Sequence, residues 1–219
     1  PDIDVLSSLW MSQPDSLLAH RGFTHSFLFI LLAVPLLSVF ARYFLKTINL
    51  SFKEWCILIG SGLIIHIFID AFTTYGTGWF EPFSHTRIAF NSLYIIDPVI
   101  LLIPFISAIA LLVLKVDHPK RKSWAGIALS LCCIYLMSAM AIKYIVNGIV
   151  KENISTQHIL SDRYMTSPAP LTNLLWFIII ESGQGYYVGY YSLFDKHNFI
   201  NLEYVMKNDS LSNNISDRK

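Results

Sequence analysis

The sequence is poor in charged residues and in cysteine. Only 14% of its 219 residues are Asp, Glu, Lys or Arg, whereas charged residues make up about 25% of a soluble domain. The formal net charge of +1 gives no sign of the clustered basic face that nucleic-acid binding requires, so we expect no nucleic acid among the partners. Cys56, Cys132 and Cys133 lie inside apolar runs without CxxC spacing, which excludes a disulfide framework and predicts packing roles.

Hydrophobic residues dominate the composition instead, at 54%, with a mean hydropathy of +0.51. Several apolar runs are long enough to span a bilayer, for which about 20 residues are needed. They cover 26–45, 55–72, 93–114 and 124–145. Two of these runs contain Pro35 and Pro104, which transmembrane helices tolerate. The composition therefore predicts an integral membrane protein.

The character of the chain changes after the last apolar run. Aromatic, apolar segments at 174–181 and 186–194 flank Ser182-Gly183-Gln184-Gly185, which is the pattern of a β-hairpin. Because two strands alone are marginally stable, the hairpin needs more strands or a supporting surface. We therefore predict a mainly α fold. It comprises a polytopic transmembrane bundle of about four helices in 1–150, a small extramembrane α/β or β domain in 151–207 that contains the hairpin, and a disordered tail in 208–219.

The connections between the apolar runs set the expected orientation. Positive residues gather after the first run and after the third: Arg42, Lys46, Lys53, Lys115, Lys120, Arg121 and Lys122. Both connections lie on one side if all the runs span, and the positive-inside rule places that side in the cytoplasm. The run ends that carry histidine and aspartate then meet at the outer face. We expect the C-terminal domain on the same extracytoplasmic side.

One pair of metal-type ligands closes the second apolar run. His66 and Asp70 are four residues apart, so they share one face of a helix. Imidazole nitrogen and carboxylate oxygen both bind Zn²⁺, which makes the pair a candidate part of a metal site. The alternative is a buried histidine that is hydrogen-bonded to the aspartate.

A second pair precedes the first run, in the segment His20-Arg21-Gly22-Phe23-Thr24-His25-Ser26. His20 and His25 are five residues apart and do not share a helix face, so the segment must turn. Gly22 permits such a turn, and Thr24 can cap the helix that follows. The alternative is a polar turn at the membrane interface that faces the lipid headgroups.

Three carboxylates are further candidates. Asp2 and Asp4 alternate, so in an extended segment both point the same way and could reach one metal site; the alternative is a plain acidic turn. Asp97 precedes Pro98, which is typical of an N-cap followed by the first residue of a helix. A capping carboxylate can still bind a metal, orient a histidine or act as a general base.

Two arginines are predicted to lie on the same face of the membrane. Arg21 and Arg87 could hold an anionic substrate or stabilise developing negative charge. The alternative is contact with lipid phosphate. Polar residues are costly in or near a bilayer and usually have a function there, so we consider all these groups together.

These segments resemble, in order, a bacterial family of membrane-bound metal-dependent hydrolases. The matching pieces are PDID at 1–4, HRGFTHS at 20–26, HIFIDAFTTYGT at 66–77, PFS at 82–84, IIDP at 95–98, and the C-terminal pieces 168–170, Trp176 and 188–195. The resemblance implies an inner-membrane protein. Members of the family usually carry a further apolar segment ahead of the first piece. Since this chain begins at Pro1, without Met or a signal peptide, we expect an upstream helix.

We interpret the sequence as a metal-dependent hydrolase that acts at the outer face of the membrane on a phosphoester of a lipid or envelope component. It would bind one or two divalent ions, expected to be Zn²⁺, through Asp2, Asp4, His20, His25, His66 and Asp70. The expected catalytic residues are Asp97, Asp70, Arg21 and Arg87. The expected partners are membrane lipids and a lipid or small-molecule substrate. A transporter with the His/Asp cluster as its ion pathway and a non-catalytic, metal-stabilised scaffold or regulator are the alternatives.

Overall fold

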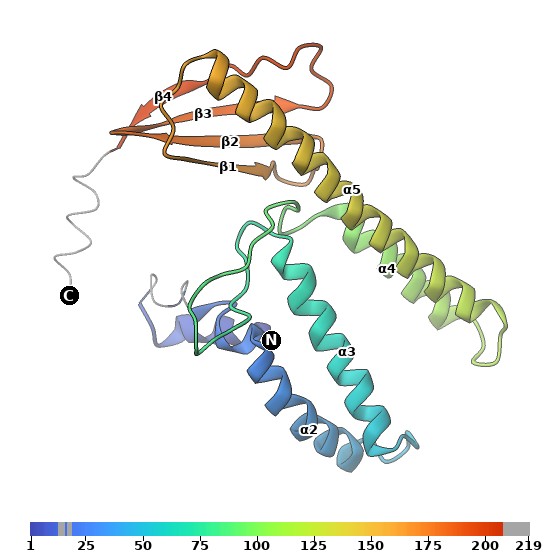
Figure 1. Ribbon diagram of the computed structural model, residues 1–219. Helices are drawn as coiled ribbons and strands as arrows, with labels where there is room; N and C mark the ends of the chain where they lie inside the picture. Colours follow the sequence, from blue (N-terminus) through green and yellow to red (C-terminus); the bar gives the residue numbers. More distant parts are fainter. Residues whose placement is uncertain (13–15, 17–18, 208–219) are drawn as a thin grey trace. The chain divides into compact units, whose positions relative to one another are not determined.

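The structure of the protein is a computed structural model that describes residues 1–12, 16 and 19–207. The chain divides into two compact units, Pro1–Asn91 and Ser92–Lys219 (Figure 1). The predicted domain boundary at 150/151 falls inside a helix of the second unit and stays a prediction. The predicted disordered tail at 208–219 lies outside the described residues.

The first unit contains two long antiparallel helices, α2 (Phe27–Phe44) and α3 (Phe52–Ala71), preceded by the short 3₁₀ helices η1 (Asp2–Leu9) and η2 (Phe23–His25). The two long helices lie side by side in Figure 1. Gly60 of α3 faces Val34 of α2. The bounds of both helices agree closely with the predicted runs at 26–45 and 55–72.

Side-chain caps determine where these two helices begin. Ser26 accepts a hydrogen bond of 3.0 Å from the backbone N–H of Phe29, which fixes the start of α2. Ser51 and Glu54 form a reciprocal capping box at the start of α3. The predicted cap at Thr24 is therefore wrong: the cap is Ser26, and Thr24 lies within η2.

The second unit begins with two helices, α4 (Pro98–Val113) and α5 (Lys120–Thr156). Asp97 caps α4, so this helix starts five residues later than the predicted run at 93–114. The Arg121 guanidinium donates to the carbonyl groups of Leu111 and Leu114 and satisfies the end of α4. With 37 residues, α5 is about 55 Å long and extends beyond the predicted end at 145.

The C-terminal part is an antiparallel sheet of four strands in the order β1-β2-β3-β4. They are β1 (Arg163–Pro168), β2 (Leu175–Ser182), β3 (Gly185–Ser192) and β4 (Glu203–Met206). The predicted hairpin is confirmed as β2 and β3, which pair with Ser182 opposite Gly185. Gly183 begins the two-residue turn between them with φ at +53°, a conformation that favours glycine.

The additional support that the hairpin requires comes from β1, β4 and α5. Trp176, Ile178 and Ile180 of β2 point to one face of the sheet and are fully buried. They share a core with Val146 and Val150 in the last turns of α5, which explains why this helix continues past its apolar run (Figure 1).

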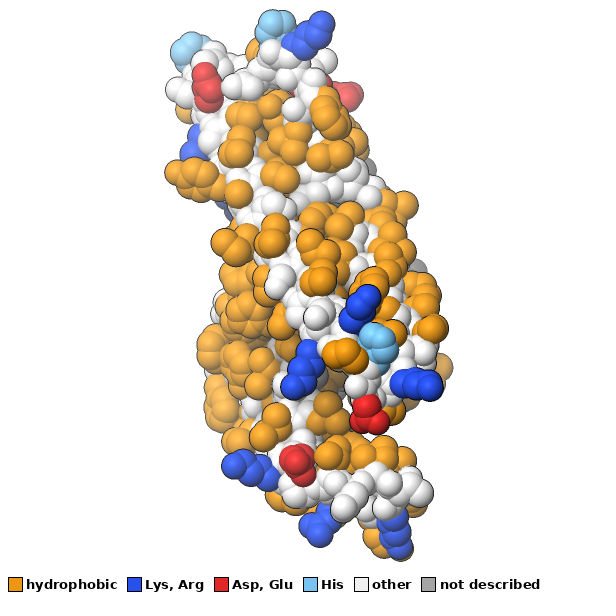
Figure 2. All heavy atoms as spheres, turned by 90° about the vertical axis from the view of Figure 1, so that its right-hand side faces the viewer, with side chains coloured by type: hydrophobic (Ala, Val, Ile, Leu, Met, Phe, Trp, Pro, Cys, Tyr) orange, Lys and Arg blue, Asp and Glu red, His pale blue; other side chains and the backbone are white. Residues whose placement is uncertain are grey.

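The membrane-spanning character is clear from the helices. In the described part of the chain, α2, α3 and α5 are long and apolar enough to cross a membrane, and α4 is a shorter apolar helix of 16 residues. Figure 2 shows one face of the protein that is covered largely by hydrophobic side chains, with few charged groups. The predicted fold class, a helical membrane protein with a small C-terminal β structure, is confirmed.

Candidate metal centre

Four of the predicted metal ligands meet in the first unit. Asp2 comes from the start of η1, His25 from the end of η2, and His66 and Asp70 from the last turns of α3. One ligand atom from each lies within 4.8 Å of all the others. Residues up to 68 positions apart in the sequence therefore form one group of two imidazoles and two carboxylates. The spacing of His66 and Asp70 on one helix face brings them together as predicted.

The distances within this group fit a divalent metal. Nε2 of His25 lies 3.3 Å from Oδ2 of Asp70 and 3.4 Å from Oδ1 of Asp2. Nε2 of His66 lies 3.4 Å from both Oδ2 of Asp70 and Oδ2 of Asp2. Adjacent ligand atoms of a tetrahedral Zn²⁺ with bonds of about 2.0–2.1 Å would be about 3.3–3.4 Å apart.

Three of these ligand atoms are buried without hydrogen-bond partners in the described part of the chain. They are Nε2 of His25, Nε2 of His66 and Oδ2 of Asp70. Buried polar atoms are normally satisfied, and an isolated one costs about 1–3 kcal/mol. Three such atoms aimed at one point are the arrangement that a bound cation would satisfy, so these residues fit a metal ion.

His25 is held in the orientation that a ligand needs. Its side chain is fully buried, and Nδ1 lies 3.1 Å from the Thr24 hydroxyl and 3.2 Å from Oδ2 of Asp4. These acceptors favour the tautomer with the proton on Nδ1, which leaves the lone pair of Nε2 for a metal.

Asp4 and His20 lie outside the ligand group, although the sequence predicted both as ligands. Oδ1 of Asp4 accepts from Nδ1 of His20 at 2.8 Å, and Oδ2 accepts from the Arg21 N–H at 2.9 Å and from the Thr24 hydroxyl. Both oxygens are thus already committed to donors. Burial alone raises the pKa of Asp4, but the hydrogen bonds from Thr24, His20 and Arg21 outweigh it and lower the pKa below its ordinary value.

Arg21 fixes the second oxygen of Asp70. One guanidinium nitrogen lies 3.3 Å from Oδ1 of Asp70, and the other donates to the Thr73 hydroxyl at 2.8 Å. The turn for which the sequence predicted Gly22 includes both Arg21, whose φ is +56°, and Gly22, whose φ of −86° and ψ of −119° lie outside the helical and extended regions. This backbone conformation places Arg21 inward, where only 8% of the residue is exposed.

A second guanidinium lies near the first. Arg87 donates to the His20 carbonyl at 2.8 Å, and its guanidinium carbon lies 5.1 Å from the centre of the Tyr75 ring. The guanidinium carbon of Arg21 lies 5.6 Å from the same centre. Sequence reasoning gave no role to Tyr75 or to Thr73. Their position directly after Asp70, in the continuous motif at 66–77, is the signal that could have found them.

The ligand group is open on one side. The Asp2 side chain is 57% exposed and His66 is 33% exposed, while Asp70 is 14% exposed. Catalytic zinc sites combine buried protein ligands with a position that water can reach, and this gradient of exposure is of that kind.

The remaining candidates have other partners. Asp97 lies in the second unit, where Oδ1 accepts from the N–H groups of Val99 and Ile100 and Oδ2 accepts from the Tyr135 hydroxyl at 2.7 Å. The N-cap alternative for Asp97 is thus confirmed, and its predicted role as a general base stays a prediction.

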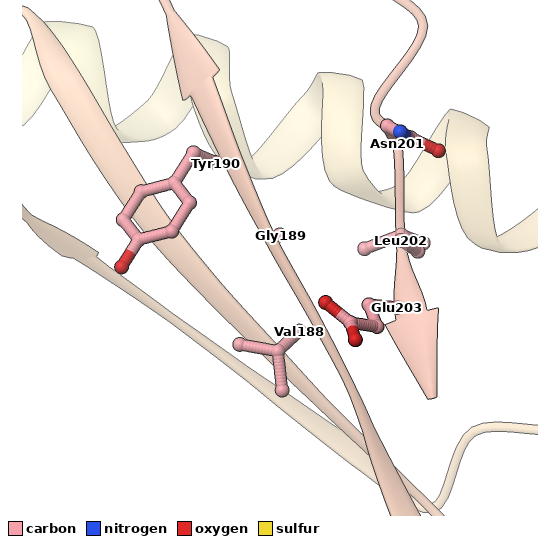
Figure 3. A pocket seen from close by; sticks show the side chains of 6 residues that line it. All are labelled: Val188, Gly189, Tyr190, Asn201, Leu202 and Glu203. Atoms are coloured by element: carbon pink, nitrogen blue, oxygen red, sulfur yellow. The ribbon is translucent and has the colours of Figure 1, made fainter. Parts of the chain in front are cut away.

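The sheet carries a hollow between β3 and the segment that enters β4. It is lined by Val188, Gly189, Tyr190, Asn201, Leu202 and Glu203 (Figure 3). Its lining contains one carboxylate and neither histidine nor cysteine, so it lacks the donors of a metal site. The histidines and aspartates that could bind a metal lie together in the first unit instead.

Apolar spanning helices with a group of metal-type ligands at the end of one of them define an integral membrane protein with a candidate metal centre. The chain belongs to the YdjM inner membrane protein family, whose profile matches residues 1–146. This family and the apolar helices together support an integral inner-membrane location.

Two relatives extend this comparison. The chain is 31% identical over 112 residues to "Uncharacterized protein YfhP" of Bacillus subtilis, which covers 51% of this chain and 33% of YfhP. It is 40% identical over 91 residues to "Inner membrane protein YbcI" of Escherichia coli, which covers 40% of this chain and 50% of YbcI. The chain thus matches half or less of the length of these relatives. No solved structure matches it.

Proposed function

We propose that the protein is a metal-dependent hydrolase that acts on a phosphoester at the outer face of the inner membrane. The observation that carries this proposal is the set of buried ligand atoms, Nε2 of His25, Nε2 of His66 and Oδ2 of Asp70, which converge without hydrogen bonds. Two imidazoles and one carboxylate form the ligand set of several catalytic zinc sites, in which water takes the next position.

The charges of the first unit support the outer location. The connection between α2 and α3 contains Lys46, with Arg42 and Lys53 on the adjoining turns. The ligand group lies at the other end of this antiparallel pair, near the start of α2 and the end of α3. The positive-inside rule places the basic connection in the cytoplasm and therefore the ligand group outside.

A Zn²⁺ ion held by these ligands would lower the pKa of a bound water to about 7 and so supply hydroxide near neutral pH. Asp2 is the most exposed carboxylate of the group, and it is placed to accept the proton of a water that enters from the open side. Arg21 holds Asp70 through Oδ1 and leaves Oδ2 for the metal. Asp4 and His20 orient His25 and η1 from outside the ligand group.

The two guanidinium groups favour an anionic ester. Arg21 contacts the ligand Asp70, and both Arg21 and Arg87 contact the Tyr75 ring, so two positive side chains share one neighbour and one of them lies beside the ligands. Positive charge fixed near the reacting bond stabilises a phosphoryl group as negative charge develops on its oxygens. A phosphoester therefore fits this site better than a neutral ester or amide.

The direct test is hydrolysis of bis(p-nitrophenyl) phosphate by detergent-purified protein. We expect activity that a chelator abolishes and Zn²⁺ restores, with a loss of at least about a hundredfold in Asp70→Asn and in Asp2→Asn. His85→Ala is the matched control, because His85 is exposed and pairs with Glu81 outside the ligand group. Metal-loaded, folded protein that is inactive on phosphomonoesters and phosphodiesters would refute the proposal.

A non-catalytic role for the metal is the second candidate. The ligands tie η1, η2 and α3 together, and a metal there would stabilise the first unit. In that case chelation would lower the thermal midpoint, while no ester would be hydrolysed. The transporter alternative fits less well, since transporters place their ion sites near the bilayer midplane and this group lies at the end of α3.

A further inference from the structure

The 3₁₀ helix η1 buries the polar side chains of Asp4 and Ser7, whereas Asp2 and Ser8 are exposed. Its apolar residues and those that directly follow are exposed as well: Ile3, Val5, Leu6, Leu9 and Trp10. So many exposed apolar side chains outside a spanning helix mark a contact with a membrane or a partner.

A cluster of aromatic side chains lies in the same unit, at the end of α2 and α3 that holds the ligand group. The ring of Phe27 lies 5.5 Å from Trp79, which stacks on Phe68 at 5.4 Å, and Phe72 contacts Phe90 at 5.2 Å. Tryptophan side chains are enriched where a membrane protein crosses the headgroup region, and Trp79 is at the centre of this cluster. Since Trp79 stacks on Phe68, two residues before Asp70 on α3, the ligand group lies near the depth of Trp79.

Exposed apolar residues occur both on η1 and on the spanning helix that follows it. α2 exposes Phe27, Leu31 and Leu32 along its first turns, and this helix is long and apolar enough to span the membrane. η1 contacts η2, which leads directly into α2. The apolar residues of η1 therefore lie close along the chain to the start of a spanning helix.

We propose that η1 lies in the headgroup region of the outer leaflet and that the substrate is an amphiphile held in that leaflet, with its phosphoester at the metal ligands and its chains in the bilayer. A short amphipathic segment binds an interface through its apolar face, as η1 can through Leu9 and Trp10. The class of substrate and the choice of the outer leaflet rest on the proposed function, whereas the location of η1 in a headgroup region does not.

Depth measurements by spin labelling test the position of η1. The full protein, with Cys56, Cys132 and Cys133 replaced by alanine, is labelled at Leu9→Cys and reconstituted in vesicles of phosphatidylethanolamine and phosphatidylglycerol. Leu36→Cys on α2 is the lipid reference, and Lys196→Cys on an exposed loop of the second unit is the water reference. We expect the label at Leu9 to collide with oxygen more than with a water-soluble nickel complex, as the label at Leu36 does. A label at Leu9 that behaves like the one at Lys196 would overturn the proposal.

Kinetics test the class of substrate. We expect Leu9→Ser with Trp10→Ser to lower kcat/KM at least about tenfold on phosphatidylglycerol in vesicles, a phosphodiester like the soluble probe. Hydrolysis of bis(p-nitrophenyl) phosphate and the zinc content should stay unchanged, and Leu160→Ser is the matched control at an exposed apolar site of the second unit. Equal rates on phosphatidylglycerol in variant and wild type, with zinc bound and the soluble ester hydrolysed, would refute an amphiphilic substrate but not the hydrolase. If zinc-loaded wild-type protein hydrolyses neither substrate, the hydrolase proposal is refuted. The spin-label measurement at Leu9 then still determines where η1 lies.

Discussion

Asp4 lies outside the group of candidate metal ligands but contacts several residues around it. Its oxygens accept from His20, Thr24 and the backbone N–H of Arg21, and Oδ2 also lies 3.2 Å from Nδ1 of His25. It therefore fixes both the fold of the segment before α2 and the orientation of the ligand His25. Partners of this kind tune metal affinity although they never touch the metal.

We predict that Asp4→Ala weakens Zn²⁺ binding by about 10–100-fold, as removal of such an orienting partner does elsewhere. The reason is that His25 loses the acceptor that fixes its tautomer. Competition with a chromophoric chelator in detergent measures the dissociation constant. Ser8→Ala is the control, because Ser8 is exposed and its hydroxyl donates only to the nearby Val5 carbonyl. An unchanged affinity would assign Asp4 a purely structural role.

At the scale of elements, the sheet is anchored by an acidic residue between two basic ones. Glu181 of β2 accepts from Arg163 of β1 and, at 2.7 Å, from Lys207 after β4. Strands on both sides of the hairpin are thus tied to one carboxylate. The hydrogen bonds from Lys207 and Arg163 lower the pKa of Glu181 below its ordinary value of 4.5.

This shift predicts a pH dependence of the sheet. Because the folded pKa is depressed, the stabilisation is fully present above the unfolded pKa and is lost as pH falls through the folded pKa. Glu181→Gln should therefore lower the thermal midpoint by a small amount at pH 7, since exposed ion pairs contribute little, and by less at pH 3. Thermal denaturation followed by circular dichroism tests this. A difference between the two proteins that grows towards pH 3 would contradict the assignment.

The elements themselves follow largely from local sequence. The apolar runs predicted α2 and α3 closely, and the turn at Gly183 predicted the hairpin. The length of α5 could not be predicted from its own composition. Its last turns are stabilised because Val146 and Val150 pack on a sheet whose strands follow α5 in the sequence. The pairing partners of the hairpin depend in the same way on tertiary contacts.

In the candidate site, too, local spacing predicted some residues, whereas the position of others depends on the tertiary structure. His66 and Asp70 could be paired from helical spacing, and topology predicted that His25 would lie on the same side of the membrane. Asp2 was a candidate, together with Asp4, only through their alternation in the sequence. That Asp4 lies outside the group of converging ligand atoms could not be predicted, because its position depends on the path of η1. Alternation assumes an extended strand, whereas η1 is a 3₁₀ helix that turns Asp4 inward and leaves Asp2 exposed.

For the molecule as a whole, the proposal requires one orientation in the membrane. We predict that a cysteine at Thr86, on the loop between α3 and the end of the first unit, reacts with a membrane-impermeant maleimide in intact cells. A cysteine at Lys46, between α2 and α3, should react only after lysis, because the positive-inside rule retains that connection in the cytoplasm. The reverse pattern would place the ligand group in the cytoplasm and exclude an extracytoplasmic substrate.

The most direct test of the metal centre is the zinc content of the purified protein by mass spectrometry, after loading and removal of excess metal. The convergence of His25, His66 and Asp70 predicts about one ion per chain in the wild type and in His85→Ala, and a loss of that ion in His66→Ala at equal folded yield. Folded wild-type protein that retains no metal, or His66→Ala that retains as much as the wild type, would contradict the account.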